Sequence, residues 1–242
     1  MLGKSEIERY SRQIMVSGLK GQESLKKAKV LVIGAGGIGS SLLPYLAAAG
    51  VGYIRFLEDD VIETSNLSRQ IIYNESEVGL LKGAVAYNKI TEMNPYIQVD
   101  WISEKFSQQN AALFIKDMDF LIDGSDDVTS KFLVSDLAVK SGMKAIISGI
   151  GVSQGHILVM NPQNGSPCYR CIFEKPPEIG VIPTCATEGV ISPLPGVMGA
   201  MIAYLVTNFY LREEISARLY TIENMVWRTL KIQKNVECIA CS

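Results

Sequence analysis

The feature that most constrains the fold is the stretch KVLVIGAGGIGSSLL, residues 29–43. An apolar strand pattern runs into glycines spaced Gly34-x-Gly36-x-x-Gly39, and a helical pattern follows. This is the spacing of the dinucleotide-binding fingerprint, in which the glycines allow a tight turn, close approach of a phosphate and close packing of helix on strand. The loop predicts only that a helix N-terminus faces an anion, so it does not by itself separate NAD from ATP.

Strand-like and helical patterns alternate over the first 150 residues. We expect strands at 29–34, 53–57, 98–102, 119–124 and 143–149, with helices at 37–49, 80–93, 108–116 and 128–141 between them. This alternation predicts an α/β fold with a Rossmann-like, mostly parallel sheet and helices on both faces.

After Gly151 the pattern changes, and the runs QGHILVM, RLYTI and WRTLKI are typical of antiparallel strands. We therefore expect one domain over 1–242. Its parts are an N-terminal helical arm (1–27), a nucleotide-binding core (28–150) and an antiparallel extension (151–242) with a crossover loop at 172–190.

Composition excludes some classes of function. The 242 residues are 48% hydrophobic, which is enough for a full core, and the formal charge of -2 lacks the basic excess of a nucleic-acid-binding protein. The charged N-terminus has no apolar core of a signal peptide, so we expect a cytoplasmic protein. The apolar stretch 195–211 falls short of the ~20 residues of a membrane span, and a core helix is favoured over a membrane helix.

Four of the five cysteines form two Cys-x-x-Cys pairs, CYRC and CIAC. Two such pairs, Cys168 with Cys171 and Cys238 with Cys241, match a tetrahedral zinc site, and the second pair would fix a chain end that otherwise frays. Disulfides or a redox pair are the alternatives, which a cytoplasmic setting disfavours. Four protein ligands leave no open position, so Zn²⁺ would be structural.

The fifth cysteine, Cys185 in IPTCATEGV, stands beside a Pro/Gly-rich loop, and the sequence leaves open a reactive thiol or a bystander. His156 is the single histidine and lies in a strand pattern. A structural role is expected for it, which makes a Ser-His or Cys-His catalytic pair improbable.

Polar residues after the second strand favour a triphosphate over NAD. Glu58 of FLEDD lies where an acidic residue bonds ribose hydroxyls in either nucleotide. The residues that follow Glu58 supply a guanidinium, an ammonium and amides. These groups suit a leaving pyrophosphate, because the charge of pyrophosphate must be neutralised. These residues are Ser65, Asn66, Arg69, Gln70 and, in GLLK, Lys82.

The fourth strand ends in DGSDD, which places Asp126 and Asp127 at the carboxyl edge of the sheet, where ligands of open α/β sheets bind. A carboxylate facing a triphosphate suits Mg²⁺. The alternative for each is an N-cap of the following helix. We favour Mg²⁺ for Asp126 and the cap for Asp127.

The chain resembles the ThiF/MoeB/HesA adenylyltransferases, bacterial relatives of the ubiquitin-activating enzymes. The motifs that carry the resemblance are, in order, RYSRQI, GAGGIG, EDDVIETSNLSRQ, GLLK, DGSDD, PCYRC, TCATEGVISPLPGVMG and CIAC. Three positions depart from the family pattern: Glu58 replaces Asp, Lys131 replaces Arg and Asp127 replaces Asn.

The resemblance implies a homodimer that binds ATP and Mg²⁺. It would adenylate the C-terminal glycine carboxylate of a small ubiquitin-like sulfur carrier ending in Gly-Gly and release pyrophosphate. It also implies that Arg12 reaches the ATP of the partner subunit. The candidate catalytic residues are Arg12, Arg69, Lys82, Asp126 and Cys185. The candidate nucleotide-binding residues are Gly34, Gly36, Gly37, Gly39, Glu58, Asp60, Ser65, Asn66, Arg69, Gln70, Lys82, Asp126 and Asp127.

The acyl adenylate would pass to sulfur through Cys185 or directly to an external persulfide donor. Because the chain has no sulfurtransferase segment, we expect sulfur to come from another protein. Three alternatives stay open: adenylation of a peptide C-terminus or small carboxylate, an NAD oxidoreductase, and a non-catalytic binding module.

Overall fold

Strand β1 (Lys29–Ile33) is the centre of the structure, and four of its five residues are buried. It pairs in parallel with β2 (Tyr53–Leu57) on one side and with β4 (Phe120–Asp123) on the other. Such strands are apolar along their whole length because both faces of a parallel sheet are covered by helices. The computed structural model describes residues 1–177, 188–212 and 217–242.

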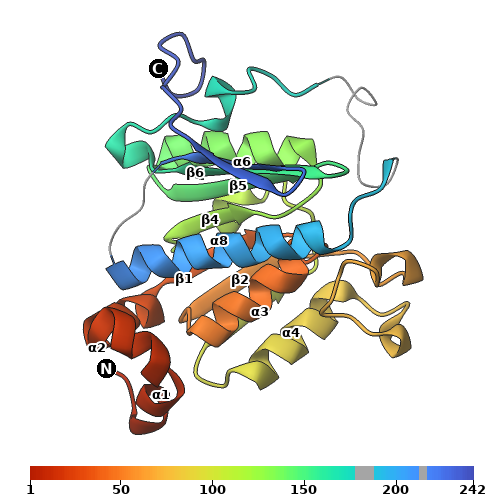
Figure 1. Ribbon diagram of the computed structural model, residues 1–242, viewed down its shortest axis with the longest axis vertical. Coiled ribbons are helices and arrows are strands. Elements are labelled where there is room, and N and C mark those ends of the chain that lie inside the picture. Colours follow the sequence, from red (N-terminus) through yellow and green to blue (C-terminus); the bar gives the residue numbers. More distant parts are fainter. Residues whose placement is uncertain (178–187, 213–216) are drawn as a thin grey trace.

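The sheet has eight strands in the order β3-β2-β1-β4-β5-β6-β7-β8 (Figure 1). The first five are parallel and the last three antiparallel, which confirms the predicted α/β class and its antiparallel addition. The remaining strands are β3 (Gln98–Ile102), β5 (Lys144–Ile150), β6 (Gln154–Met160), β7 (Leu219–Glu223) and β8 (Val226–Leu230).

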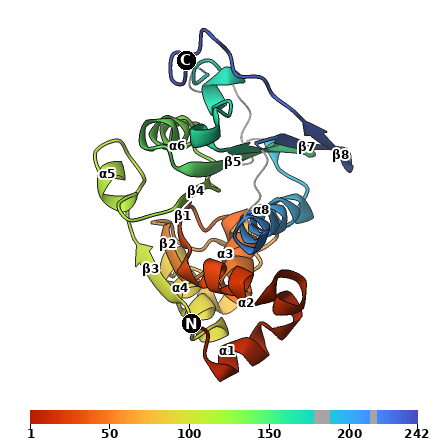
Figure 2. The ribbon, with the colours of Figure 1, turned by 90° about the vertical axis from the view of Figure 1, so that its left-hand side faces the viewer.

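Helices cover both faces of the sheet (Figure 2). One face carries α3 (Gly39–Ala49), α4 (Lys82–Met93) and α8 (Pro193–Arg212), which bury one hydrophobic cluster against it. The other carries α5 (Ala111–Phe114) and α6 (Val128–Ser141), together with the cysteine pairs, in a second cluster. Short 3₁₀ turns lie at Thr64–Asn66, Glu75–Glu77, Pro162–Asn164 and Tyr169–Cys171.

Helix α5 is shorter than the expected 108–116. The Asn110 side chain accepts from Ser107 N and donates to Lys105 O, so it stabilises a turn before the helix. Asp117 adopts a positive φ of 63° just after the helix, which interrupts any continuation. Local side-chain bonds of Asn and Asp compete with helix in this way.

Helix α8 is longer than the expected 195–211, and by length and composition it could cross a membrane. In the fold it lies across α3, with Met198 and Ile202 fully buried in the core cluster. Its opposite face exposes Val197 and Tyr204 at 44% and 63%. The expected core helix is therefore buried on one face only.

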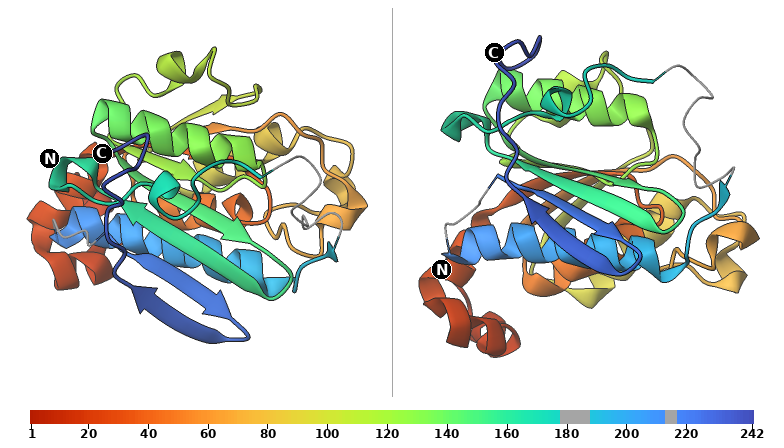
Figure 3. Two further views of the ribbon diagram at one scale, coloured as in Figure 1. Left: turned by 90° about the horizontal axis from the view of Figure 1, so that it is seen from above. Right: turned by 45° about the horizontal axis from the view of Figure 1, so that its top comes forward.

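The N-terminal arm consists of α1 (Lys4–Arg9) and α2 (Ser11–Lys27), which is kinked at Gly18 with a φ of 71°. In Figure 1 this arm and the C-terminus lie at opposite ends of the long axis. The β7–β8 hairpin projects at the sheet edge, and all five residues of β8 are exposed (Figure 3).

Candidate functional site

The glycine loop joins β1 to α3 at the carboxyl edge of the sheet. Gly34 has a φ of 93°, a conformation that side-chain-bearing residues rarely adopt. A Cβ at Gly39 would lie 2.3 Å from the Gly34 carbonyl oxygen, so any side chain there would force helix and strand apart. Both fingerprint roles, the tight turn and the close packing, thus have a steric basis in this loop.

A second loop, between β4 and α6, packs against the glycine loop. A Cβ at Gly34 would lie 3.2 Å from Ser125 Cα, so the backbones meet directly. Because β2 and β4 flank the parallel strand β1 on opposite sides, the order in which strands are added to the sheet reverses here. This is the crevice in which open α/β sheets bind ligands.

The two aspartates in this second loop differ: one is a helix cap, and the other has no partner in the part of the chain that the structure describes. Asp127 is the N-cap of α6: its carboxylate accepts from Thr129 N at 2.9 Å and from Ser130 N at 3.3 Å. Asp126 is exposed and has no hydrogen bond or ion pair within the described residues. The favoured cap at Asp127 is confirmed, and the magnesium role of Asp126 stays a prediction.

Glu58 is buried beside the glycine loop, where its carboxylate accepts from Ala35 N at 2.8 Å and Asp60 N at 3.1 Å. Burial raises its pKa, and these two N–H groups oppose the shift. Lys82 begins α4 as expected and pairs with Asp60 at 3.1 Å (Nζ to Oδ2). The Lys82 side chain is 7% exposed, and this ion pair holds its ammonium group beside Asp60.

The segment after β2 contributes further polar groups. Arg69 Nη1 donates to Ser65 O at 2.9 Å, and its Cδ lies against Gly37. Gln70 is buried, faces Gly36 with its amide nitrogen, and has no partner for Oε1 within the described residues. Asn66 is also buried and accepts from Glu63 N, which holds the turn.

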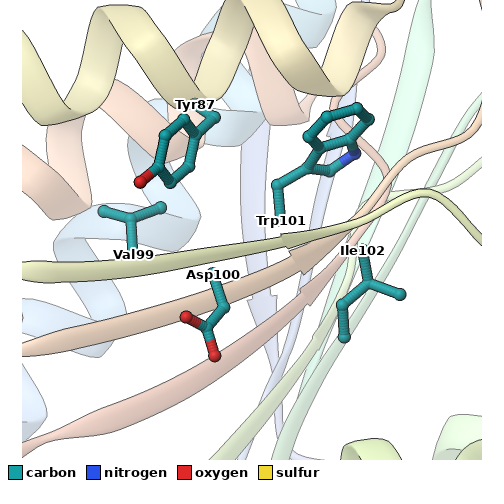
Figure 4. A pocket seen from close by; sticks show the side chains of 5 residues that line it. All are labelled: Tyr87, Val99, Asp100, Trp101 and Ile102. Carbon is teal, nitrogen blue, oxygen red and sulfur yellow. The ribbon is translucent and has the colours of Figure 1, made fainter.

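A hollow lies away from this crevice, at the outer edge of β3 (Figure 4). Tyr87 of α4 and Trp101 of β3 lie between the helix and the strand there, whereas Asp100 points to the other side of the strand. Trp101 Nε1 donates to Glu58 O at 2.8 Å. Trp101 therefore fixes the backbone carbonyl of Glu58.

The four cysteines of the two pairs converge although 70 residues separate them. Their sulfur atoms lie within 4.8 Å of one another, and three Sγ–Sγ distances are 3.9 Å (168–171), 3.5 Å (168–238) and 3.4 Å (171–241). Tetrahedral Zn–S bonds of about 2.3 Å would give sulfur separations of about 3.8 Å. The donor set fits Zn²⁺.

The cysteine cluster is fastened to α6. Arg170 donates twice to Asp136, at 2.8 and 2.9 Å, and Tyr169 N donates to Ser135 Oγ at 3.0 Å. His156 lies beside the Tyr169 and Phe173 rings, and burial lowers its pKa to about 4. A neutral, packed imidazole agrees with the structural role expected for it.

Arg12 lies far from the glycine loop. Its neighbour Gln13 donates to Ala49 O at 2.9 Å, at the end of α3 opposite the loop. The 11 residues of α3 span about 16 Å. Arg12 is exposed and makes no ion pair with any described residue. Cys185 lies outside the described residues.

The sequence profile of the ThiF family matches residues 10–240. The chain belongs to the ThiF family. It is 39% identical over 252 aligned positions to the adenylyltransferase and sulfurtransferase UBA4 of Saccharomyces cerevisiae, covering 99% of this chain and 57% of UBA4. A sulfur carrier protein adenylyltransferase of Thermus thermophilus is 36% identical, covering 98% of this chain and 92% of that protein. The chain thus spans little more than half the length of the UBA4 relatives.

Solved structures with the same fold include E. coli MccB crystallised with ATP. MccB has a TM-score of 0.85 and 23% identity, with 99% of this chain and 75% of MccB covered. The structure of PaaA has a TM-score of 0.79 at 23% identity, with 97% of this chain and 76% of PaaA covered. At these identities the likeness concerns the ThiF fold alone.

Three features of this ThiF-family site escaped sequence reasoning. Pro195 of α8 lies against Gly37, which no local pattern indicates. Tyr73 donates to Ala35 O at 2.9 Å and braces the glycine loop. Asp123 pairs with Lys131 in the interior. The sequence does indicate that Asp123 has a buried partner, because a charged residue within an apolar strand pattern requires one.

Proposed function

We propose that this ThiF-family chain is an adenylyltransferase that activates the C-terminal glycine carboxylate of a small ubiquitin-like sulfur carrier with ATP and releases pyrophosphate. The observation that supports the proposal is the contact between Gly34 of the glycine loop and Ser125, the residue before Asp126, whose exposed carboxylate has no partner among the described residues. The relative from Thermus thermophilus, named a sulfur carrier protein adenylyltransferase and matched almost end to end, supports the choice of acyl substrate.

The reaction needs no catalytic acid or base. A carboxylate oxygen of the carrier attacks the α-phosphorus, the new acyl–O–P bond forms, and the bond to the β-phosphate breaks as pyrophosphate leaves with its electron pair. Positioning and charge neutralisation are then sufficient. We assign them to the glycine loop, with Glu58 and Asp60 beside the ribose and Ser65, Asn66, Arg69, Gln70 and Lys82 along the phosphates.

Asp126 fits Mg²⁺, because it is an exposed carboxylate without a protein partner within the described residues, at the crevice where the phosphates would lie. Mg²⁺ prefers one or two carboxylates and keeps waters and phosphate oxygens as its other ligands. When bound, it would neutralise phosphate charge. Asp127 would support the site only indirectly, since its carboxylate is committed to the cap of α6.

We further propose a homodimer in which Arg12 serves the site of the partner subunit. The distance of α2 from its own glycine loop supports this, because the side chain would have to span the length of α3. Exposed apolar side chains on the adjoining helices α2, α3 and α8 would offer a surface for the dimer. These side chains are Met15, Val16, Leu19, Tyr45, Val197 and Tyr204, each 44–76% exposed.

The cysteine cluster would bind a structural Zn²⁺ and hold the C-terminal segment on α6. Backbone N–H groups of Ala240 and Cys241 lower the pKa of Cys238 to about 7 against the effect of burial, and Asn235 N lies 3.4 Å from Cys171 Sγ. Sulfur would come from an external donor protein, with Cys185 as the candidate carrier of the acyl group.

ATP/pyrophosphate exchange with candidate carriers tests the proposal. Exchange should require the carrier and should be lost when its terminal glycine is deleted, because the attacking carboxylate would then be misplaced. An unrelated peptide with a free C-terminus is the control. Exchange that is equal with the truncated carrier, or that the unrelated peptide supports as well, would refute the carrier as substrate.

A further inference from the structure

An ion pair is buried directly behind the crevice. Asp123, the last residue of β4, is 0% exposed, and Lys131 in α6 is 5% exposed. Their Nζ and Oδ2 atoms are 2.7 Å apart. Desolvation makes such pairs weak contributors to stability, since apolar residues of similar size often stabilise a fold as well. We therefore expect the pair to have a role other than stabilising the fold.

The Lys131 ammonium has a second partner in the loop next to the crevice. It donates to Ser125 O at 2.6 Å, while Ser125 Oγ donates to Asp123 Oδ1 at 2.7 Å. Ser148 Oγ, from β5, donates to Asp123 O at 2.8 Å. Lys131 thus connects α6 and β4 to the turn that precedes Asp126.

These contacts fix the backbone on both sides of Asp126. Ser125 is held on one side by Lys131 and Asp123 and packs against Gly34. Asp127 is held on the other side by its cap of α6. The Asp126 carboxylate is free, but the peptide that carries it is anchored at each end.

We propose that Lys131 is a positioning residue, which holds the Ser125 carbonyl so that Asp126 faces the metal-nucleotide complex in the crevice. This rests on the proposed function, which assigns Mg²⁺ to Asp126. Lys131 itself touches neither substrate nor metal. Its effect should appear as weaker metal binding in a folded protein.

The single variant Lys131→Met is a poor test, because it leaves Asp123 buried without its partner. Burial raises the pKa of Asp123, and Lys131 is the charge that opposes the shift. The double variant Asp123→Ala/Lys131→Met removes both charges and lets the flexible Met side chain fill the space. Lys131→Arg keeps the charge and can donate to both oxygens. Lys140→Met, on the exposed end of the same helix, is the matched control.

The measurement is Mn²⁺ binding by electron paramagnetic resonance in the presence of a non-hydrolysable ATP analogue. A melting curve of each variant accompanies it. We expect the double variant to melt cooperatively near wild type yet bind Mn²⁺ at least about tenfold more weakly, the size seen when groups that orient metal ligands are removed. Lys131→Arg and Lys140→Met should bind Mn²⁺ like wild type.

Wild-type Mn²⁺ affinity in a folded double variant would overturn the proposal, as would equally weak binding in Lys140→Met. Asp126→Ala separates this failure from that of the proposed function. If Asp126→Ala weakens Mn²⁺ binding and the double variant does not, only the role of Lys131 is wrong. If Asp126→Ala binds Mn²⁺ like wild type, the metal assignment fails and the role of Lys131 fails with it.

Discussion

Mixed dimers can test whether Arg12 acts across the subunit interface. In a heterodimer of Arg12→Ala with Asp126→Ala, the Arg12→Ala subunit keeps its own Asp126 and would receive Arg12 from its partner. One of the two sites is then complete, and the other lacks both groups. The structure favours this arrangement because Gln13, next to Arg12, contacts the end of α3 opposite the glycine loop.

The expected activity follows from counting sites. Each parent homodimer should lose about 10²-fold in ATP/pyrophosphate exchange, as when a principal electrostatic group is removed. Heterodimers isolated with two different affinity tags should recover about half of the wild-type activity, and an unselected equal mixture about a quarter, if subunits of a two-fold dimer exchange at random. Native mass spectrometry checks that the heterodimer has formed.

A second heterodimer provides the reciprocal control. Wild type paired with the double variant Arg12→Ala/Asp126→Ala contains no complete site if Arg12 acts across the interface, but one complete site if it acts within its own subunit. The first heterodimer should therefore be active and the second inactive. The reverse result would refute the trans assignment, and a monomeric protein with full exchange would refute the dimer as well.

Four further outcomes are expected. Protein purified without chelator should contain one zinc per chain by elemental analysis, and Cys168→Ser should lose it together with several kcal/mol of unfolding free energy, because a structural zinc site contributes folding energy; a zinc-free wild type would contradict this. Asp126→Ala should abolish exchange, whereas Cys185→Ser should retain exchange and block only sulfur transfer; full sulfur transfer in Cys185→Ser would make that thiol a bystander. Asp127→Asn should be nearly neutral and Asp127→Ala should cost about 1 kcal/mol in chemical denaturation, the usual effect of an N-cap; equal effects would argue against the cap. Burial lowers the pKa of His156 from 6.5 in the unfolded state to about 4 in the folded state. Between these values only the unfolded state gains a proton, so the free energy of unfolding should drop by about 3 kcal/mol as the pH falls from 6.5 to 4. A His156→Gln variant with the same slope of unfolding free energy against pH would show that other groups cause the loss.

The elements that sequence predicted best are those whose signal is local. The strands at 53–57, 98–102 and 154–160 have the expected bounds, because continuous or alternating apolar runs end at turn residues there. The cap at Asp127 follows from one residue and the helix after it. The cysteine cluster was predictable for a different reason, since four thiols in two pairs have few other uses.

Features that depend on tertiary contacts could not be read in this way. The charge of Asp123 at the end of an apolar strand indicates that a partner is needed, but only the fold shows that Lys131 lies within 2.7 Å of it. Helix α5 lost its first turn to the side-chain bonds of Asn110. The outer face of α8 is as apolar as its buried face, so periodicity gave no sign that one side is exposed.

Helix α8 explains why a nucleotide site and a subunit interface would depend on each other in this fold. Near its start, Pro195 packs against Gly37 and Gly196 O accepts from Ser41 Oγ at 3.0 Å, beside the glycine loop. Near its end, Leu211 O lies against Gly21 of the arm that carries Arg12. The 16 residue steps from Pro195 to Leu211 span about 24 Å along the helix. One rigid helix therefore sets the spacing between the glycine loop, which would bind the chain's own ATP, and Arg12, which would act in the partner's site. The apolar outer face of the same helix lies where the two subunits would meet.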